Sequence, residues 1–366
     1  MEPHAPPLPV SPTPAPLVPS PRADAPGSPP LPLAPAAPCL SVIVVNYRLW
    51  QDTAGLVRRL RAAACWRAGA AEVVVVDNDS PTDPAVGRLR RTPGVSLRRW
   101  RRNRGFAQAV NEGCRLSRGD WLLLLNPDVT PDPGFLDAAL ALAQRRAAEE
   151  PSVGVLGFRL RNPDGSHQHS VGLFPTLAGT LLRLLLPRDR RKYDGRPARQ
   201  RRPVDWATGC CLLIRRDCWR QVGGLDPDFF LYYEDVDFCR RARAAGWSVW
   251  YEPAPSVVHH SPLHARTPTP HVRLFTRHAL LTYGLKHWPL WQVRILSLIV
   301  RAEAWAKRCS AFLRGEPFAA EVFGDLGVVA AELGRGRPAA AGRRLRRAVQ
   351  RLEGPRADPV RRRPQP

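Results

Sequence analysis

Three short runs of apolar residues constrain the fold of this chain more than any other feature of its sequence. They lie within residues 41–47, 72–80 and 121–129, are rich in Val, Ile or Leu, and each leads into Asn or Asp. Runs this short that are apolar on both faces are typical of buried strands in a parallel sheet. Helical patterns separate and follow them, for example at 106–116 and 135–149. The alternation predicts an α/β fold with a mostly parallel central sheet covered by helices on both faces.

Polar side chains follow each apolar run at one predicted edge of this sheet. In open α/β sheets, ligands bind outside the carboxyl ends of the strands. One Asn or Asp at such a position would be consistent with an ordinary turn, but three in succession indicate a binding site. A carboxylate here can accept a hydrogen bond from a base, and another can hold Mg²⁺ or Mn²⁺ beside phosphates. The residues concerned are Asn46, Asp77, Asn78, Asn126 and Asp128.

A second cluster of carboxylates follows an aromatic segment within residues 223–247. Carboxylates in the first turn of a helix are stabilised by its dipole, so a purely structural role stays open for Asp237, which helical spacing brings beside Arg241. Glu234 and Asp235 lie directly behind the aromatic residues. A general base must reach a hydroxyl while it is shielded from water, so we predict a catalytic role for this pair.

Two further segments add polar groups to the predicted site. Residues 255–262 read as a strand that ends in His259 and His260, which predicts a contact with a metal or a diphosphate. Asn103 and Gly105 precede the predicted helix at 106–116. The chain has neither a G-x-G-x-x-G nor a Walker A sequence, so a Rossmann or P-loop grip on phosphate is not supported.

The formal net charge of +23 raises the question of a nucleic-acid partner. Only three of the 55 basic residues are Lys, which indicates codon bias, and no zinc-finger, RRM or KH pattern is present. We therefore expect no specific nucleic acid and favour an anionic membrane surface as the basic chain's partner. Residues 272–313 interleave apolar residues with Arg294 and Arg301. Packing against the catalytic domain is the default for this stretch, and an in-plane membrane anchor is the alternative.

The rest of the chain divides by composition. We predict a disordered Pro-rich tail at 1–38, a catalytic domain at 39–270, a basic amphipathic helical extension at 271–335 and an Arg/Pro-rich tail at 336–366, which begins with a frayed helix. No signal peptide is recognised, and no apolar run approaches the roughly 20 residues that span a bilayer. The eight cysteines lack C-x-x-C spacing and are expected to be buried thiols in a reducing cytosol.

Taken together, these segments resemble glycosyltransferase family 2 on the GT-A fold, particularly its rhamnosyltransferase-like branch. Each motif alone is weak, but eight of them in the family's order are specific. The resemblance implies an α/β fold of GT-A type with a helical C-terminal extension. The motifs run from about residue 40 to 262 and are SVIVVNY, VVDNDS, NRGFAQAVNEG, LLLLNPDV, NPDGSHQHS, WATGCCLLIRR, VGGLDPDFFLYYEDVDFCRRARAAGW and VVHHSP.

The resemblance implies roles for individual residues. Asp128 stands at the family's metal-binding D-x-D position, but the first Asp of that pair is Asn126 here, which weakens the expected dependence on Mg²⁺ or Mn²⁺. His259 matches the metal or diphosphate histidine, with His260 as the register-shifted alternative. The general base is expected to be Asp235, with Glu234 second. The nucleotide is expected to contact Asn46, Asp77, Asn78, Asn103 and Gly105, and the acceptor to contact Trp206, Gly209 and Tyr233.

The expected reaction is an inverting transfer of a hexosyl group from a nucleotide-diphosphate sugar of the UDP or dTDP type. The acceptor is a hydroxyl of a glycan or lipid-linked acceptor in cell-surface polysaccharide synthesis, with rhamnose as the family-level expectation for the sugar. We expect the enzyme in the cytoplasm, peripheral to the inner face of the cell membrane. Two alternatives stay open. A nucleotidyltransferase would show a Gly-rich triphosphate loop near the first strand, and a basic non-enzymatic module would leave the ordered acidic motifs unexplained.

Overall fold

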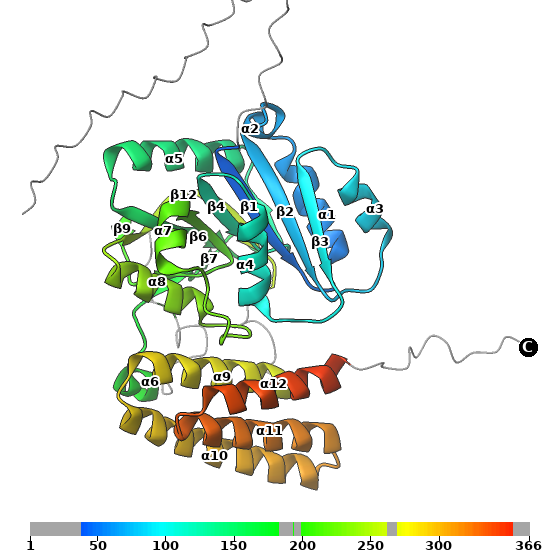
Figure 1. The fold of residues 1–366 in the computed structure, drawn as a ribbon, viewed down its shortest axis with the longest axis vertical. Coiled ribbons are helices and arrows are strands. Elements are labelled where there is room, and N and C mark those ends of the chain that lie inside the picture. The colour runs from blue at the N-terminus through cyan, green and yellow to red at the C-terminus, as the bar shows by residue number, and fades with distance from the viewer. Residues whose placement is uncertain (1–37, 183–192, 194–198, 262–268, 354–366) are drawn as a thin grey trace, which may run out of the picture. The chain divides into compact units, whose positions relative to one another are not determined.

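The computed structural model describes residues 38–182, 193, 199–261 and 269–353. Its centre is a ten-stranded sheet whose main path runs in the order β3-β2-β1-β4-β11-β6-β12-β5 (Figure 1). These strands are β1 (Leu40–Asn46), β2 (Ala71–Asn78), β3 (Val95–Trp100), β4 (Trp121–Leu125), β5 (Val129–Pro131), β6 (Val153–Arg161), β11 (Cys211–Arg215) and β12 (Ser248–His259). The short strands β7 (His167–Gln168) and β9 (Arg202–Pro203) pair with β6 and β12, while β8 (Val171–Gly172) pairs with β10 (Trp206–Ala207).

Most of the sheet is parallel. Along the main path, all strands run in one direction except β11 and β5, which pair antiparallel to their neighbours. The carboxyl ends of β1, β2 and β4 therefore lie at one edge, as we predicted from their polar ends. The tail that we predicted at 1–38 lies outside the described residues except for its last residue.

Helices cover both faces of the sheet because its central strands are apolar on both sides. In β1, Leu40, Val42 and Val44 pack into one core, and Ile43 and Val45 pack into the other. The first core is completed by α1 (Trp50–Leu60), α2 (Ala64–Arg67), α3 (Pro84–Arg90) and α5 (Phe135–Glu149), and the second by α4 (Phe106–Leu116), α7 (Arg216–Val222) and α8 (Glu234–Ala244). The prediction of an α/β fold, with a mostly parallel sheet covered by helices on both faces and a helical C-terminal extension, is confirmed.

The C-terminal region forms a helical bundle with a hydrophobic core of its own. Its helices are α9 (Pro270–His287), α10 (Leu290–Leu313), α11 (Pro317–Gly334) and α12 (Pro338–Glu353), and α6 (Leu177–Leu182) contributes Leu177 to the same core (Figure 1). None of the helices that the structure describes is long and apolar enough to cross a membrane. All eight cysteines are free, and six of them are buried.

Helix α12 lies at the start of the segment 336–366, where we expected a frayed helix followed by an Arg/Pro-rich tail. Ala341, Leu345, Ala348 and Val349 recur at helical spacing and are buried in the bundle core. Five other positions of the helix are arginines, and two of them, Arg344 and Arg351, form ion pairs with the buried Asp325 of α11. A narrow apolar stripe is therefore sufficient to hold this Arg-rich helix on the bundle.

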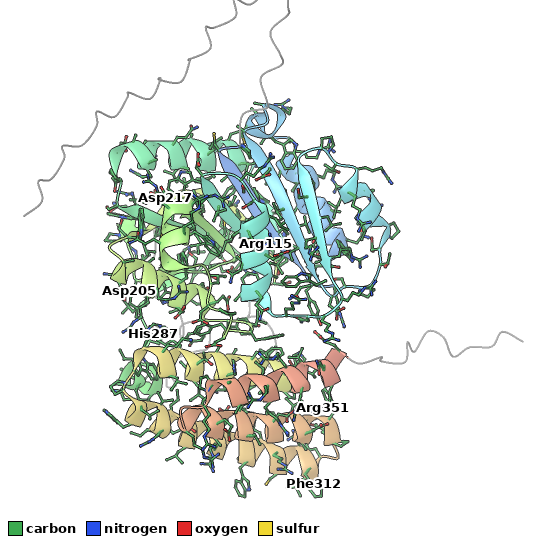
Figure 2. The ribbon with its side chains drawn as sticks, in the orientation of Figure 1. Arg115, Asp205, Asp217, His287, Phe312 and Arg351 are labelled. Carbon is green, nitrogen blue, oxygen red and sulfur yellow. The ribbon has the colours of Figure 1, made fainter. Side chains whose placement is uncertain are left out.

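A buried ionic cluster joins the bundle to the α/β part of the molecule. Asp237 of α8 is fully buried, accepts a hydrogen bond from Arg241 Nε at 2.7 Å, and lies 2.8 Å from Nε2 of His287 in α9 (Figure 2). Burial alone would raise the pKa of Asp237, but the hydrogen bond with His287 and the charge of Arg241 outweigh it and lower the pKa. Of the two roles that the sequence left open for Asp237, the structure favours the structural one.

Gly105, which precedes α4, brings two distant loops into backbone contact. Its φ of 91° and ψ of 163° are accessible to glycine almost alone. A Cβ at this position would lie 2.6 Å from the carbonyl oxygen of Phe230, to which Phe106 N donates a hydrogen bond at 2.7 Å. The 103–106 loop and the segment that leads into α8 therefore approach each other only because residue 105 has no side chain.

We predict that Gly105→Ala lowers the free energy of unfolding by about 3 kcal/mol or more, because it combines backbone strain with a clash against a carbonyl. Gly165→Ala is the matched control, since Gly165 also has a positive φ of 83° but has no atom near the place of a Cβ. Its expected cost is about 1 kcal/mol. Urea unfolding of both variants measures the difference, and equal costs would contradict the role assigned to the contact.

We also predict a pH-dependent stability that originates in His278 of α9. Burial lowers the pKa of this imidazole from 6.5 to about 4. Between these values the unfolded chain binds a proton that the folded chain does not, so stability falls as the pH decreases from 6.5 towards 4. His278→Phe should reduce the stability lost between pH 7 and pH 5 by about 2 kcal/mol. Urea unfolding at both pH values tests this, and an unchanged loss in the variant would contradict it.

Candidate active site

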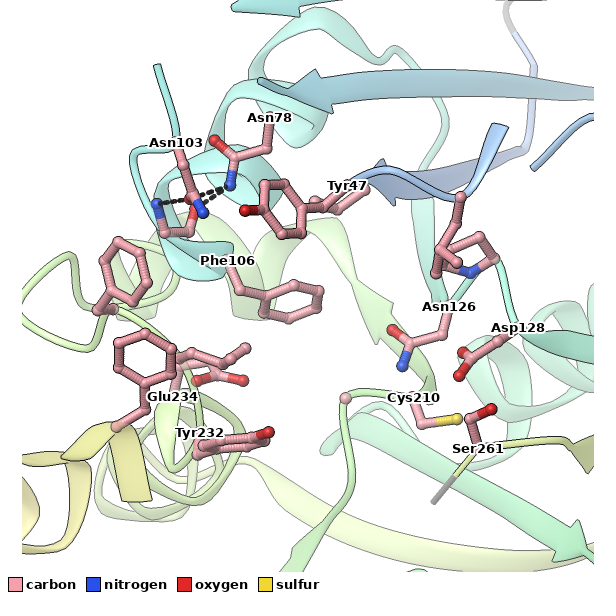
Figure 3. A pocket seen from close by; sticks show the side chains of 18 of the residues that line it. Tyr47, Asn78, Asn103, Phe106, Asn126, Asp128, Cys210, Tyr232, Glu234 and Ser261 are labelled. Carbon is pink, nitrogen blue, oxygen red and sulfur yellow. Dashed lines mark hydrogen bonds between the residues drawn. The ribbon is translucent and has the colours of Figure 1, made fainter. Parts of the chain in front are cut away.

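A pocket of about 750 Å³ opens where the polar ends of the strands meet (Figure 3). The ends of β1, β2 and β4 line it, together with the 103–106 loop, residues 208–210 and the segment that leads into α8. Helices α9 and α12 of the bundle contribute further side chains. A volume of this size is in the range of sites that bind small organic ligands.

One side of the pocket is built from amides. Asn78 Nδ2 donates to Asn103 Oδ1 at 2.8 Å and to the carbonyl of Gly105 at 3.2 Å, while Asn78 Oδ1 accepts from Arg104 N at 2.8 Å (Figure 3). These bonds hold the 103–106 loop against the end of β2. Asn78, Asn103 and Gly105, which we predicted to contact a nucleotide, all line the pocket.

Asn46 and Asp77, in contrast, are not among the residues that line the pocket. Both are fully buried, and Asn46 Nδ2 donates to Asp77 Oδ1 at 2.9 Å. The other carboxylate oxygen of Asp77 accepts from Arg99 Nε at 2.9 Å, and Asn46 also bonds Ser80 and Thr53. In the structure these two residues form a hydrogen-bond network with Arg99, Ser80 and Thr53, and the nucleotide contact that we expected for them stays a prediction.

The opposite side of the pocket carries a carboxylate beside an imidazole. Asp128 Oδ2 lies 3.6 Å from His259 Nε2, and both side chains are 12% exposed. Nδ1 of His259 lies 2.7 Å from Gln168 Oε1, which orients the ring. His260, the register-shifted alternative, bonds Thr130 and does not line the pocket.

These two groups suit a divalent cation that shares its other ligands with a substrate. A carboxylate oxygen is a preferred ligand of Mg²⁺ and Mn²⁺, and imidazole is accepted by Mn²⁺. Among the described residues, no third His, Cys, Asp or Glu side chain joins them into a metal-binding cluster. A cation held by Asp128 and His259 would therefore take further oxygen ligands from phosphates and water.

Glu234 and Asp235 open α8 at the pocket wall. Each is 5% exposed, and both line the pocket (Figure 3). Asp235 Oδ2 accepts a hydrogen bond from the backbone of Gly209 at 3.0 Å, and its Oδ1 accepts from Val236 N at 2.8 Å. Backbone donors thus hold both carboxylate oxygens of Asp235 and fix the orientation of this side chain at the pocket wall.

The backbone immediately before this pair is strained. Tyr232 and Tyr233 have φ values of 74° and 66°, a left-handed conformation that non-glycine residues rarely adopt. Consecutive residues in this conformation turn the chain sharply at the start of α8. Such strain is typical of segments that position functional groups, and here it directs Glu234 and Asp235 to the pocket.

The three residues expected on the acceptor side are not brought together. Gly209 lines the pocket and donates to Asp235, but Trp206 and Tyr233 are not part of the lining. The indole of Trp206 is buried and donates to the carbonyl of Leu173, and the ring of Tyr233 packs on Tyr283 of α9. The acceptor contact that we expected for these two residues stays a prediction.

Tyr47 and Glu353 line the pocket but were not identified from the sequence. Tyr47 follows the first apolar run directly, and its hydroxyl donates to Glu353 Oε1 at 2.8 Å. Burial and this hydrogen bond to Glu353 raise the pKa of Tyr47 to about 12. The same Oε1 of Glu353 accepts from Asn103 Nδ2 at 2.6 Å. The position of Tyr47 beside Asn46 could have indicated its role, whereas nothing in the Arg-rich context of Glu353 did so.

Comparisons with known proteins agree with this geometry. The model of a family described as glycosyltransferase like family 2 matches residues 37–279. The N-acetylglucosaminyl-diphospho-decaprenol L-rhamnosyltransferase of Mycobacterium tuberculosis is 33% identical over 240 residues, which cover 60% of this chain and 76% of the relative. The low-salt glycan biosynthesis hexosyltransferase Agl10 of Haloferax volcanii is 28% identical over 243 residues, or 61% of this chain and 68% of the relative.

Among solved structures, a mannosyltransferase of Pyrobaculum calidifontis in complex with GDP-Man and Mn²⁺ aligns with 88% of this chain and 90% of that chain, at 19% identity and a TM-score of 0.48. The family match covers the whole central sheet and most of the pocket, and the two relatives are named as a rhamnosyltransferase and a glycan biosynthesis hexosyltransferase. The chain belongs to glycosyltransferase family 2 and is a glycosyltransferase.

Proposed function

We propose that this glycosyltransferase moves a sugar from a nucleotide-diphosphate donor to a hydroxyl of a lipid-linked acceptor, with inversion at the anomeric carbon. The observation that carries the proposal is that one pocket is lined by the Asn78–Asn103 amides, the Asp128–His259 pair and the carboxylate of Asp235. In this proposal the amides bind the nucleotide, the Asp128–His259 pair serves the diphosphate, and Asp235 serves the acceptor. Family membership favours this reading over a nucleotidyltransferase and over a non-enzymatic basic module.

The donor is of the UDP or dTDP type, and its sugar is rhamnose. Asn78, Asn103 and Gly105 contact the nucleotide from the pocket lining, and Asn46 and Asp77, at the ends of β1 and β2, belong to the same nucleotide site. The M. tuberculosis relative is a rhamnosyltransferase whose printed acceptor is N-acetylglucosaminyl-diphospho-decaprenol. Its identity of 33% supports the same classes of donor sugar and lipid-linked acceptor for this chain.

Asp128 and His259 would hold Mg²⁺ or Mn²⁺ in this pocket. A bound cation would neutralise charge that develops on the diphosphate as it leaves. The protein supplies only this one carboxylate and one imidazole among its described residues, so the cation's affinity depends on the donor. This agrees with the weakened metal dependence expected from Asn126, which replaces a carboxylate.

The transfer itself requires a base and a single displacement. Asp235 takes the proton of the acceptor hydroxyl as its oxygen forms a bond to the anomeric carbon. The bond between that carbon and the diphosphate oxygen breaks on the opposite face, so the configuration inverts without a covalent enzyme intermediate. We favour Asp235 over Glu234 because the amide of Gly209 holds one of its oxygens in a defined position. An ordered donor of this kind keeps a base oriented.

A lipid-linked acceptor implies action at a membrane. We propose that the protein works on the cytoplasmic face, where nucleotide sugars are made, as a peripheral enzyme. In this proposal the catalytic domain is residues 39–270, and the basic amphipathic extension at 271–335 belongs to the part of the chain that meets the membrane. The net charge of +23 supports an anionic surface as partner.

A thermal-shift screen of UDP-, GDP- and dTDP-sugars with and without Mn²⁺ tests the donor. At least one UDP or dTDP sugar is expected to raise the Tm, and Mn²⁺ is expected to increase the shift, because ligand binding to the folded state stabilises it. Failure of every donor to change the Tm would sink the proposal.

With the donor so identified, Asp235→Asn should lower kcat by about 1000-fold or more, because the variant retains the shape of the site but loses the base. Donor binding should change less than threefold, since Asp235 is assigned to the acceptor. Asp217→Asn, at an exposed carboxylate on α7, is the matched control and should keep full activity (Figure 2). Full activity of Asp235→Asn would overturn the assignment of the base, and Glu234→Gln would then be measured in the same assay.

A further inference from the structure

Helix α10 presents an apolar stripe to solvent along its whole length. The stripe consists of Trp291, Ile295, Leu298, Trp305 and Phe312, which recur at intervals of three, four or seven residues and so share one face of the helix. Trp305 is 70% exposed and Phe312 is 79% exposed. Figure 2 shows Phe312 at the edge of the bundle. Soluble surfaces rarely leave so many large apolar side chains in line, so the stripe calls for a partner.

Packing within the bundle does not explain this stripe. The opposite face of α10 carries Val293, Leu296, Val300, Ala304 and Ala311, which are buried in the bundle core against α9 and α11. The helix is therefore apolar on two faces, and the bundle uses only one. Both readings that the sequence left open for this segment, core packing and contact with a membrane, are compatible with a helix of this kind.

A row of arginines borders the stripe. Arg294, Arg301 and Arg308 are all exposed and lie seven residues apart, so they follow one flank of the helix in step with the stripe. A helix with Trp and Leu on one face and arginines on its border is the pattern that binds in the interface of a bilayer. Trp side chains are favoured at the level of the lipid headgroups, and arginines bind lipid phosphates.

We propose that the α10 stripe and its arginine row dock on the surface of an anionic lipid bilayer. Charge complementarity selects this occupant, because a second copy would bring another arginine row and another net charge of +23 against the first. A nucleic acid would leave the Leu, Ile and Phe side chains without a partner. The inference deepens the proposed location at a membrane, and it concerns binding alone, independent of sugar transfer.

The test is co-sedimentation of the full chain with vesicles. Vesicles of phosphatidylcholine with phosphatidylglycerol should bind the protein, and pure phosphatidylcholine should bind it far more weakly. Replacement of Arg294, Arg301 and Arg308 by Gln should weaken binding on the order of 100-fold, since each arginine near an anionic surface contributes about fivefold. Replacement of Trp291, Trp305 and Phe312 by Ser should weaken it comparably.

The matched control replaces Arg58, Arg88 and Arg90 by Gln, which removes the same charge from exposed positions on α1 and α3. This variant should retain most of the binding. Equal vesicle binding by the control and by the arginine-row variant would overturn the proposal. So would a dimer of the wild type in light scattering that the Trp/Phe variant abolishes, because the stripe would then be covered by a second copy. Donor-induced Tm shifts, measured on the same variants, report separately on the proposed function.

A different observation carries a second inference, at the donor end of the pocket. Helix α12 lies beyond the residues matched by the family model, yet it brings Val349, Leu352 and Glu353 to the pocket lining. The carboxylate of Glu353 lies within hydrogen-bond distance of the Tyr47 hydroxyl and the Asn103 amide. The pocket wall on this side is thus closed by a group from the helical bundle.

The chemistry of this carboxylate points to the nucleoside and away from the phosphates. A carboxylate repels a diphosphate but accepts hydrogen bonds from ribose hydroxyls or a base N–H. Figure 3 shows Tyr47, Asn78 and Asn103 together on one side of the pocket, with Asn126 and Asp128 on another. We infer that Glu353 is a specificity-determining residue that accepts a hydrogen bond from the nucleoside of the donor. This inference rests on the proposed function.

Isothermal titration of UDP and dTDP tests this second inference. Glu353→Ala should weaken binding of the preferred nucleotide about tenfold or more, as expected for loss of a charge-assisted hydrogen bond, and should raise the KM of the donor with kcat nearly unchanged. Glu316→Ala, which removes an exposed carboxylate at the N-cap of α11 outside the pocket, is the matched control and should bind as the wild type does.

The outcomes separate the two claims. A wild type that binds no nucleotide contradicts the proposed function itself. A wild type that binds UDP or dTDP while Glu353→Ala binds equally well or more tightly contradicts only the role of Glu353, because the carboxylate would then be a spectator or would obstruct the site.

Discussion

The backbone contact between Gly105 and Phe230 is the constraint on which the active site depends. Phe106 N donates to the carbonyl of Phe230, and no side chain larger than hydrogen fits at residue 105 between these two loop segments. One side of this contact carries Asn103, which is bonded to Asn78 at the end of the parallel sheet. The other side leads within a few residues to Asp235. The amide wall and the base, which come from segments more than a hundred residues apart, are held in one pocket by this approach.

The parallel sheet could be predicted because its strands are apolar on both faces, and a chain of that kind has few other folds open to it. The edge that carries the site followed from the same reasoning. The same reasoning did not predict which polar residue faces the pocket, because neighbouring residues of a strand point to opposite sides. Asp77 and Asn78 are adjacent, and only Asn78 lines the pocket, while Asp77 turns to Arg99. A shift of one residue along the strand therefore decides which side chain lines the pocket. Secondary-structure propensities of the residues do not reveal this choice.

The helical bundle shows a second limit of the same kind. Helix α12 is held by a stripe of Ala, Leu and Val within an Arg-rich segment, so composition suggested a frayed helix and did not show that it packs on the bundle. Helix α10 is apolar on two faces, and a sequence cannot tell which of them is buried. Glu353 is the last residue of α12, and only the fold brings it to Tyr47 and Asn103. Long-range contacts carry this information, and local patterns do not.

The left-handed conformation of Tyr232 and Tyr233 has a consequence for how this site was selected. Each such residue costs on the order of 1–3 kcal/mol relative to a relaxed backbone, and glycine at either position would remove most of that cost. A chain optimised for stability alone would carry glycine here. The tyrosine rings are therefore worth more to the protein than the strain they impose: Tyr232 faces the pocket, and Tyr233 packs on Tyr283 of the bundle. In this segment the molecule retains two phenol side chains at a cost in folding free energy, one in the pocket lining and one packed against the bundle.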